Sequence, residues 1–181
     1  MFLEIRKMRK SFGGLVAVSD VDLSLREGSI HAIIGPNGAG KTTFFNCITA
    51  VKPCDTGEII WQGERIEGLK THEIAKKGIG RTFQNIRLFP YMTVLENVLV
   101  GTHHLTKSML PAVTFRTPFA RREEREMREF SLGLLERVGL ADKKDHYARN
   151  LPYGEQRRLE IARAMAGKPK LLLLDEPAAG M

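Results

Sequence analysis

The sequence predicts an α/β domain in which buried strands end in a glycine-rich loop and in acidic residues. Three observations support this prediction. An apolar run at residues 30–34 leads into a glycine-rich loop and then into a helical segment. Residues 21–25 alternate apolar and polar side chains, which is the period of a half-buried strand. Four consecutive leucines at residues 171–174 end in Asp175-Glu176, a pattern typical of a buried parallel strand.

The elements of the first half follow one another closely. The strand at 21–25 ends in a turn at Glu27-Gly28, because glycine adopts turn conformations at little cost. The run 30–34 predicts a buried parallel strand, and residues 41–48 predict the helix after the glycine-rich loop. Residues 58–61 and 78–83 predict two further strands, the first of them turning at Gln62-Gly63.

The second half is predicted to be mostly helical. Thr93 is followed three residues later by Glu96, a capping-box pattern that predicts a helix over 93–100. Residues 101–118 are predicted to be irregular, with Pro111 and Pro118 as helix breakers.

The last predicted elements are two helices and a strand. From Ala120 onward, apolar residues recur on one helical face at Met127, Phe130, Leu134 and Val138. The charged residues 121–126 are then predicted to form the solvated face of the same helix. A further helix is predicted over 154–166, and the leucines 171–174 predict the final strand.

The composition restricts the classes of function. The chain has 181 residues, of which 43% are apolar and 27% charged, as is ordinary for a soluble domain. The net charge is +7, but the basic residues are spread along the chain, so we expect no nucleic-acid partner. No apolar run approaches the roughly 20 residues that span a bilayer. We therefore expect a cytoplasmic protein that meets a membrane only through a partner.

The glycine-rich loop carries the chemistry of phosphate binding. It matches the pattern G-x-x-x-x-G-K-[ST] at Gly35, Pro36, Asn37, Gly38, Ala39, Gly40, Lys41 and Thr42. Glycines let backbone N–H groups approach phosphate oxygens, and the helix that follows directs its positive end toward them. Lys41 is predicted to reach the β- and γ-phosphates of ATP, and Thr42 to ligate Mg²⁺.

The acids after the leucine run supply the second half of such a site. Asp175 is predicted to hold Mg²⁺ through water, and Glu176 to polarise the attacking water. Together with the phosphate-binding loop, these acids predict a nucleoside triphosphatase.

Four segments in this order and spacing resemble the nucleotide-binding subunits of ABC transporters. The segments are Gly35 to Thr43, Thr82-Phe83-Gln84, Leu151-Pro152-Tyr153-Gly154-Glu155-Gln156-Arg157-Arg158 and Leu174-Asp175-Glu176-Pro177. Within that family, the segments 12–18, 85–89, 92–98 and 157–164 are most similar to the branched-chain amino acid importer ATPases of the LivG type. The resemblance covers essentially the whole chain.

The resemblance implies a P-loop NTPase fold of the ABC ATPase type. It implies a nucleotide-binding core with an antiparallel β side-layer over 1–84, a helical subdomain over 85–152, and a return to the core over 153–181. Phe12 would stack on adenine, and Thr43 would join the phosphate-binding loop. Gln84 would sense Mg²⁺ and the γ-phosphate, both as a metal ligand and as a catalytic residue. The signature loop, with Leu151, Gly154, Glu155 and Gln156, would contact the γ-phosphate of ATP bound by a second subunit.

The resemblance also implies partners and a location. The function would be ATP hydrolysis driving import of branched-chain or other hydrophobic amino acids. The partners would be membrane subunits, a second ATP-binding subunit of the same or a related kind, and indirectly a periplasmic or extracellular substrate-binding protein. The chain would lie as a peripheral subunit at the cytoplasmic face of the plasma (inner) membrane.

The sequence departs from the family pattern in two places. Pro152 and Tyr153 replace the serine and first glycine of the common signature, and Glu155 replaces its glutamine, so we expect a weaker contact across the dimer. The sequence ends at Met181, before the D-loop and the switch histidine of the family, so we expect a C-terminally truncated cassette that binds MgATP weakly and hydrolyses it slowly or not at all.

Three alternatives stay open at this point. One is a nucleotide-binding module with little or no hydrolysis. Another is a soluble ABC ATPase that acts on DNA or ribosomes, although neither a second cassette nor a coiled-coil insertion is visible. A third is transport of a different substrate, such as urea or lipopolysaccharide, since the substrate is selected by other subunits.

Overall fold

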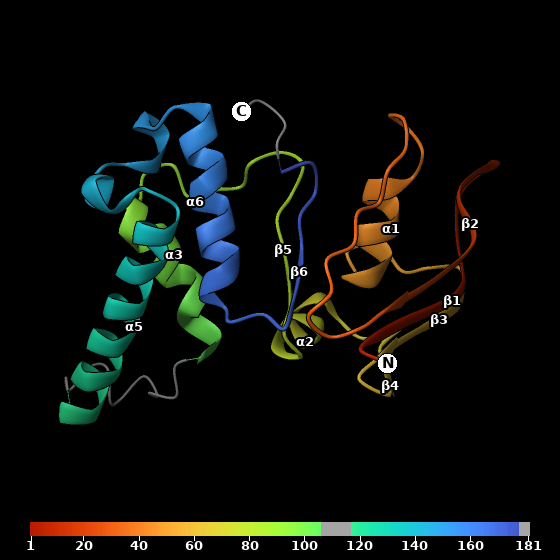
Figure 1. Cartoon of the computed structure of the whole chain (residues 1–181), viewed down its shortest axis with the longest axis horizontal. Coiled ribbons are helices and arrows are strands. Elements are labelled where there is room, and N and C mark those ends of the chain that lie inside the picture. The colour runs from red at the N-terminus through yellow and green to blue at the C-terminus, as the bar shows by residue number, and fades with distance from the viewer. Residues whose placement is uncertain (106–116, 178–181) are drawn as a thin grey trace. The chain divides into compact units, whose positions relative to one another are not determined.

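The computed structural model describes residues 1–105 and 117–177 (Figure 1). The chain divides into two compact units, Met1–Lys77 and Gly78–Met181. Each unit has its own elements and its own buried core.

The first unit is built on a four-stranded antiparallel sheet. Its strands are β1 (Leu3–Phe12), β2 (Leu15–Leu25), β3 (Thr56–Trp61) and β4 (Glu64–Arg65), in the order β2-β1-β3-β4 (Figure 1). The predicted strands 21–25 and 58–61 are confirmed as parts of β2 and β3, and the turn at Gln62-Gly63 joins β3 to β4. This sheet is the antiparallel layer expected near the N-terminus.

The period of two places one face of this sheet in the core. Leu3 lies opposite Trp61 and Ile5 opposite Ile59 in the register of β1 and β3, and all four side chains are buried. Side chains directly opposite one another on adjacent strands pack closely. The predicted helix after the glycine-rich loop is confirmed as α1 (Lys41–Ile48), and a second helix, α2 (Thr71–Lys76), follows the sheet.

The predicted parallel strand at 30–34 is wrong. No strand forms there, and Ile30 and Ile34 are 99% and 92% exposed. A buried parallel strand needs hydrogen-bonded neighbours and apolar cover on both faces. No strand among the described residues pairs with this segment, so the apolar run lacks the partners that would make it a strand.

The second unit contains a short parallel sheet. Its strands are β5 (Ile79–Arg81) and β6 (Leu171–Leu173), with Ile79 opposite Leu171 and Arg81 opposite Leu173. The two predicted strands are therefore confirmed, and each is shorter than predicted. Because the strands are parallel, the residues after Arg81 and after Leu173 leave the sheet at the same edge.

Within residues 78–105 and 117–177, the second unit also contains three α-helices and three short 3₁₀ helices. The helices are α3 (Val94–Thr102), α5 (Pro118–Arg137) and α6 (Tyr153–Ala166), and the 3₁₀ helices are η1 (His103–Leu105), η2 (Ala141–Lys143) and η3 (Ala148–Asn150). The three α-helices pack against one another around buried Val98, Leu135, Leu140 and Leu159 (Figure 1).

The structure confirms the capping box and the charged face. The Thr93 hydroxyl accepts a hydrogen bond from the backbone N–H of Glu96, at 3.2 Å, and the Glu96 carboxylate accepts one from the backbone N–H of Thr93, at 2.7 Å. On the solvated face of α5, Arg122 and Glu126 form an ion pair at 2.8 Å.

The predicted irregular stretch 101–118 is wrong at both ends. Helix α3 continues through Thr102, η1 follows, and Pro118 is the first residue of α5. Proline is tolerated in the first helical turn, where its missing N–H has no partner to lose, and the Thr117 hydroxyl accepts a hydrogen bond from the Ala120 backbone N–H. The remaining residues of this prediction, 106–116 with Pro111, lie outside the described residues.

Within the described ranges, none of the helices is both long and apolar enough to cross a bilayer.

Candidate functional site

The phosphate-binding loop lies between the exposed segment 30–34 and helix α1. Gly38 and Gly40 have φ angles of 84° and 85°, a left-handed conformation that only glycine adopts readily. The Lys41 ammonium donates hydrogen bonds to the carbonyl oxygens of Gly35, at 2.7 Å, and Pro36, at 2.9 Å. The lysine is therefore folded back along its own loop.

The start of α1 suits an anion. Gly40 is the N-cap residue, and the first turn contains Thr42 and Thr43 and no acidic side chain. Backbone N–H groups at the start of a helix point outward along its axis, and the helix dipole adds a partial positive charge there. Loop residues 36–39 are exposed. The arrangement can therefore receive phosphate oxygens through backbone N–H groups and Lys41.

Phe12 is placed at the end of β1, beside the turn into β2. Its ring is 45% exposed, and the Lys10 ammonium lies 5.4 Å from the ring centroid. An exposed ring in a hairpin can stack on a planar base, so the geometry allows the predicted contact with adenine. That role stays a prediction.

The predicted acids and Gln84 lie at one edge of the parallel sheet in the second unit. Gln84 follows β5 and is exposed, whereas Asp175 follows β6 and is only 2% exposed. Glu176 is half-buried and has a φ angle of 49°, which is uncommon for a residue with a side chain. The parallel pairing thus places Gln84 at the same edge as two acids that come about 90 positions later in the chain.

Asp175 is held by groups from the β5 segment. Its carboxylate accepts a hydrogen bond from the Arg81 guanidinium at 3.0 Å, and both side chains are buried. Its backbone N–H donates to the Thr82 hydroxyl at 3.2 Å. The Thr82 backbone N–H in turn donates to the Leu173 carbonyl at 3.0 Å. The two strands are therefore joined beyond their last paired residues.

A buried ion pair on α6 also contacts this edge of the parallel sheet. The sequence alone does not identify this pair as part of the site. Arg157 and Glu160 are each 1% exposed and lie 2.7 Å apart. The sequence shows that they share a helix face, because they are three positions apart. The exposed pair of Arg122 and Glu126 has nearly the same spacing, so no signal in the sequence distinguishes the buried pair.

The signature segment opens helix α6. Leu151 is buried, and its carbonyl accepts a hydrogen bond from the Gln156 side-chain amide at 2.8 Å. Gly154 is in the first turn, and the Glu155 carboxylate is 2.5 Å from the Lys143 ammonium. The four predicted signature residues are thus gathered at one helix start.

Pro152 is the N-cap residue of α6. A helix does not use the backbone N–H of its N-cap in its own hydrogen-bond ladder, so the proline costs the helix nothing. The predicted weakening of the contact across a dimer stays a prediction.

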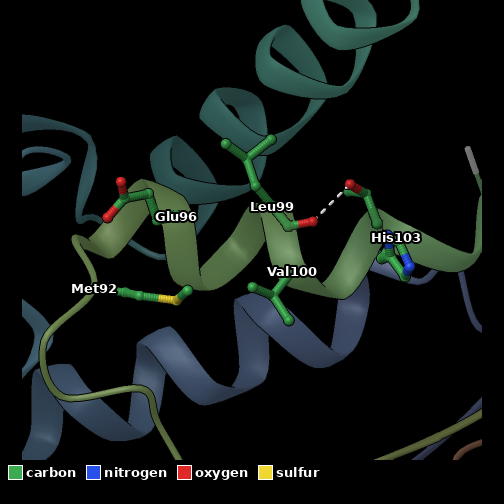
Figure 2. A pocket seen from close by; sticks show the side chains of 6 residues that line it. Met92, Glu96, Leu99, Val100 and His103 are labelled. Carbon is green, nitrogen blue, oxygen red and sulfur yellow. Dashed lines mark hydrogen bonds between the residues drawn. The ribbon is translucent and has the colours of Figure 1, made fainter. Parts of the chain in front are cut away.

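A separate open pocket of about 430 Å³ lies along α3 (Figure 2). Its lining is mostly apolar and consists of Met92, Glu96, Leu99, Val100, Thr102 and His103. Hydrogen bonds from the Thr93 backbone N–H and hydroxyl lower the pKa of the Glu96 carboxyl. The pocket contains none of the predicted site residues, and it carries a carboxylate toward one end and His103 toward the other.

Comparisons with known proteins agree with these observations. The family model described as ABC transporter matches residues 18–179. The high-affinity branched-chain amino acid transport ATP-binding protein BraF of Pseudomonas aeruginosa is 50% identical over 180 residues, which is 99% of this chain and 70% of that protein. The corresponding LivG protein of Escherichia coli K12 is 46% identical over 179 residues, with the same shares.

Solved structures give the same result for the fold. The ADP conformation of an ATP-binding cassette of an ABC transporter matches with a TM-score of 0.81 and 34% identity, over 99% of this chain and 70% of that chain. The dimeric structure of a bacterial ABC transporter cassette matches with a TM-score of 0.83 and 28% identity, over 99% of this chain and 76% of that chain. With the phosphate-binding loop, the acids and the signature helix in place, the chain belongs to the ABC transporter family, as an ATP-binding cassette.

Proposed function

We propose that this chain hydrolyses ATP to energise import of branched-chain or other hydrophobic amino acids across the plasma membrane. The observation that carries this proposal is the complete phosphate-binding loop at the start of α1. The amino acid class rests on the relatives, which are named as high-affinity branched-chain amino acid transport ATP-binding proteins.

The phosphate-binding loop would hold the ATP phosphates. Lys41 would exchange its two bonds to the Gly35 and Pro36 carbonyls for bonds to β- and γ-phosphate oxygens. Bonds between an ammonium and phosphate are charge-assisted and stronger than bonds to neutral carbonyls. This exchange would favour the nucleotide-bound loop. Phe12 would hold the adenine by stacking.

The donor set suits Mg²⁺, which prefers oxygen ligands and keeps several waters when bound to protein. Thr42 offers a hydroxyl, Gln84 an amide oxygen and Asp175 a carboxylate. When bound, the cation neutralises charge on the phosphates. Asp175 would act through water, since its carboxylate is buried and bonded to Arg81.

Glu176 would polarise the attacking water. Glu176 follows the buried Asp175 and is itself half-buried. Its backbone has the left-handed conformation. A carboxylate beside the γ-phosphate can accept a proton from water as the water oxygen bonds to phosphorus and the bond from phosphorus to the leaving ADP oxygen breaks. Gln84, at the same edge of the sheet, would orient that water or the cation.

A second ATP-binding subunit would face the start of α6. The first turn of that helix contains the half-buried Gly154 and Glu155, and the Glu155 carboxylate pairs with Lys143 of η2 and with Arg158 of the next turn. Backbone N–H groups at a helix start can bind a γ-phosphate. A dimeric cassette among the similar structures supports this arrangement.

The membrane subunit would contact the segment that follows Gln84. Phe89, Tyr91 and Met92 are exposed there by 45%, 74% and 38%, and Met92 lines the α3 pocket (Figure 2). Exposed apolar side chains gathered beside a pocket favour a protein partner. The chain would then act as a peripheral subunit at the cytoplasmic face of the membrane.

The substitution Glu176→Gln tests the assigned chemistry. It removes the base but keeps the size and much of the hydrogen bonding, so steady-state phosphate release should fall on the order of a hundredfold or more. ATP affinity, measured by calorimetry, should stay within about threefold, because Lys41 and the loop are unchanged. The substitution Glu124→Gln on the exposed face of α5 is the control. Phosphate release at a substantial fraction of the original rate would reject Glu176 as the base.

Uptake tests the transported class. Cells that lack this chain should lose high-affinity uptake of radiolabelled leucine and isoleucine and should regain it when the chain is restored. Restoration by the Glu176→Gln chain would contradict the proposal that hydrolysis energises this import.

A further inference from the structure

We propose that Arg157, oriented by Glu160, is a positioning residue that holds the segments carrying Glu176 and Gln84 in their working geometry. The inference rests on the proposed function, because that function assigns the chemistry to Glu176 and Gln84. Arg157 itself is 1% exposed, and it acts through the backbone of other residues.

The Arg157 guanidinium binds both segments at once. One terminal nitrogen donates to the Phe83 carbonyl at 2.5 Å and to the Glu160 carboxylate at 2.7 Å. The other donates to the carbonyls of Asp175 and Glu176, the latter at 2.9 Å. A planar guanidinium presents its donors in a fixed fork, so these carbonyls are held at set positions relative to one another.

Glu160 completes the arrangement from the same helix. One carboxylate oxygen accepts the bond from Arg157, and the other accepts hydrogen bonds from the backbone N–H groups of Phe83, at 3.3 Å, and Arg87, at 3.4 Å. These two residues flank Gln84 and the two positions after it. Phe83 is therefore held through both its N–H and its carbonyl, directly before Gln84.

The backbone of Glu176 needs such support. Its φ angle of 49° is left-handed, and residues with a Cβ keep this conformation only where the surroundings impose it. The bond from Arg157 to the Glu176 carbonyl is such a constraint. Because the backbone conformation sets the direction of the side chain, Arg157 determines where the Glu176 carboxylate can lie.

Arg157 and Glu160 lie on α6, the helix that the signature segment opens. The signature segment ends at Gln156, and Arg157 is the next residue on the helix. A rigid helix moves as one body, so a displacement of the helix start carries the guanidinium with it. The pair therefore links the end of the helix that would face a second subunit to the acids of the same chain.

The substitution Arg157→Lys tests this role. Lysine keeps the charge, but its compact ammonium cannot reach three carbonyls on two segments together with the Glu160 carboxylate. The rate of phosphate release per ATP-binding site should fall by about tenfold or more, because small displacements of a reacting group cost large factors in rate. The KM for ATP should stay within about twofold, since the phosphate-binding loop is unchanged. The number of binding sites comes from calorimetric titration of the same sample.

Two controls separate positioning from folding. Arg128→Lys makes the same chemical change at an exposed arginine of α5 that lies outside the proposed site. Leu159→Val shortens a fully buried side chain of the helical core and lowers stability without touching the two segments. Both should keep the rate per binding site within about twofold. A second variant, Glu160→Gln, should lower that rate in the same direction as Arg157→Lys.

The outcomes are distinguishable from those for the proposed function. An Arg157→Lys rate per site within twofold of the original, or an equal loss in Leu159→Val, would overturn the positioning role. If Glu176→Gln abolishes turnover while Arg157→Lys does not, only the positioning inference fails. If Glu176→Gln retains turnover, the assigned base fails instead.

Discussion

Two regions hold their functional groups by different kinds of contact. One is the phosphate-binding loop of the first unit, and the other is the acid-bearing edge, which is the edge of the β5–β6 sheet in the second unit where Asp175 and Glu176 lie. The loop is exposed, and Lys41 bonds to carbonyls five and six positions before it. At the acid-bearing edge, Asp175 and Arg157 are buried, and their contacts reach Arg81 and Phe83, which are 94 and 74 positions away.

This difference predicts that substitutions in the two regions affect ligand affinity and the stability of the fold differently. A loop held by short-range backbone conformation can lose its functional side chain without exposing a core. An edge held by buried ionic contacts cannot, because each removed partner leaves another charged or polar group without its bond. Substitutions in the loop should therefore change ligand affinity, and substitutions at the edge should change stability as well as chemistry.

The largest expected effect is on ATP binding by Lys41→Ala. The substitution removes the ammonium that would bond to two phosphates, and bonds to charged groups contribute about 1.5 to 3 kcal/mol each. ATP affinity should therefore fall on the order of a hundredfold or more. Lys41 is only half-buried, so the thermal midpoint should hardly move. Calorimetric titration with ATP and a thermal melt on the same sample measure both quantities.

The control for this variant is Lys52→Ala. Lys52 is an exposed lysine that follows α1 in the same unit, so its removal changes the net charge equally without touching the loop. A similar loss of ATP affinity in both variants would mean that the loss comes from the change in net charge and not from a contact between Lys41 and phosphate. Unchanged affinity in Lys41→Ala would reject the phosphate-binding assignment.

The next effect is on stability and is expected when one member of a buried pair is changed. Glu160→Gln leaves the Arg157 guanidinium buried without its counter-charge and should lower the free energy of unfolding by about 3 kcal/mol. Glu58→Gln in the first unit removes a negative charge whose partners, Arg6 and Arg65, are largely exposed. Its effect should be too small to separate from experimental error, because solvent screens exposed pairs. Urea unfolding of the two variants provides the comparison.

Equal losses in these two variants would show that burial does not distinguish the pairs. A large loss in Glu58→Gln alone would contradict the account of the second unit as the one held by ionic contacts.

The same contrast explains what could be predicted from the sequence. The phosphate-binding loop, α1 and the capping box of Thr93 with Glu96 were all predictable, because each depends on residues within a few positions of one another. The acids after β6 were predictable as candidates, because an apolar run ending in acids is a local pattern.

What could not be predicted depends on distant partners. The apolar run 30–34 has the composition of a strand, but a strand exists only where a neighbour pairs with it, and none does among the described residues. The bonds of Arg157 and Glu160 to Phe83 depend on contacts between positions 74 and 77 residues apart. Their spacing of three along α6 differs little from the spacing of four in the exposed pair of Arg122 and Glu126, so only the structure distinguishes the buried pair.

The last prediction contrasts two glycines, one in the loop and one at the start of α6. A Cβ at Gly40 would collide with the Ala17 carbonyl oxygen, and its φ angle is 85°, so Gly40→Ala should lower the free energy of unfolding by about 2 kcal/mol. Gly154 lies within α6 with nothing within 4 Å of an added Cβ. Gly154→Ala should therefore raise the free energy of unfolding by about 0.5 to 1 kcal/mol, because alanine favours the helix. Urea unfolding in the absence of nucleotide measures both. Shifts of the same sign would contradict the different conformations assigned to the two helix starts, since one requires glycine and the other does not.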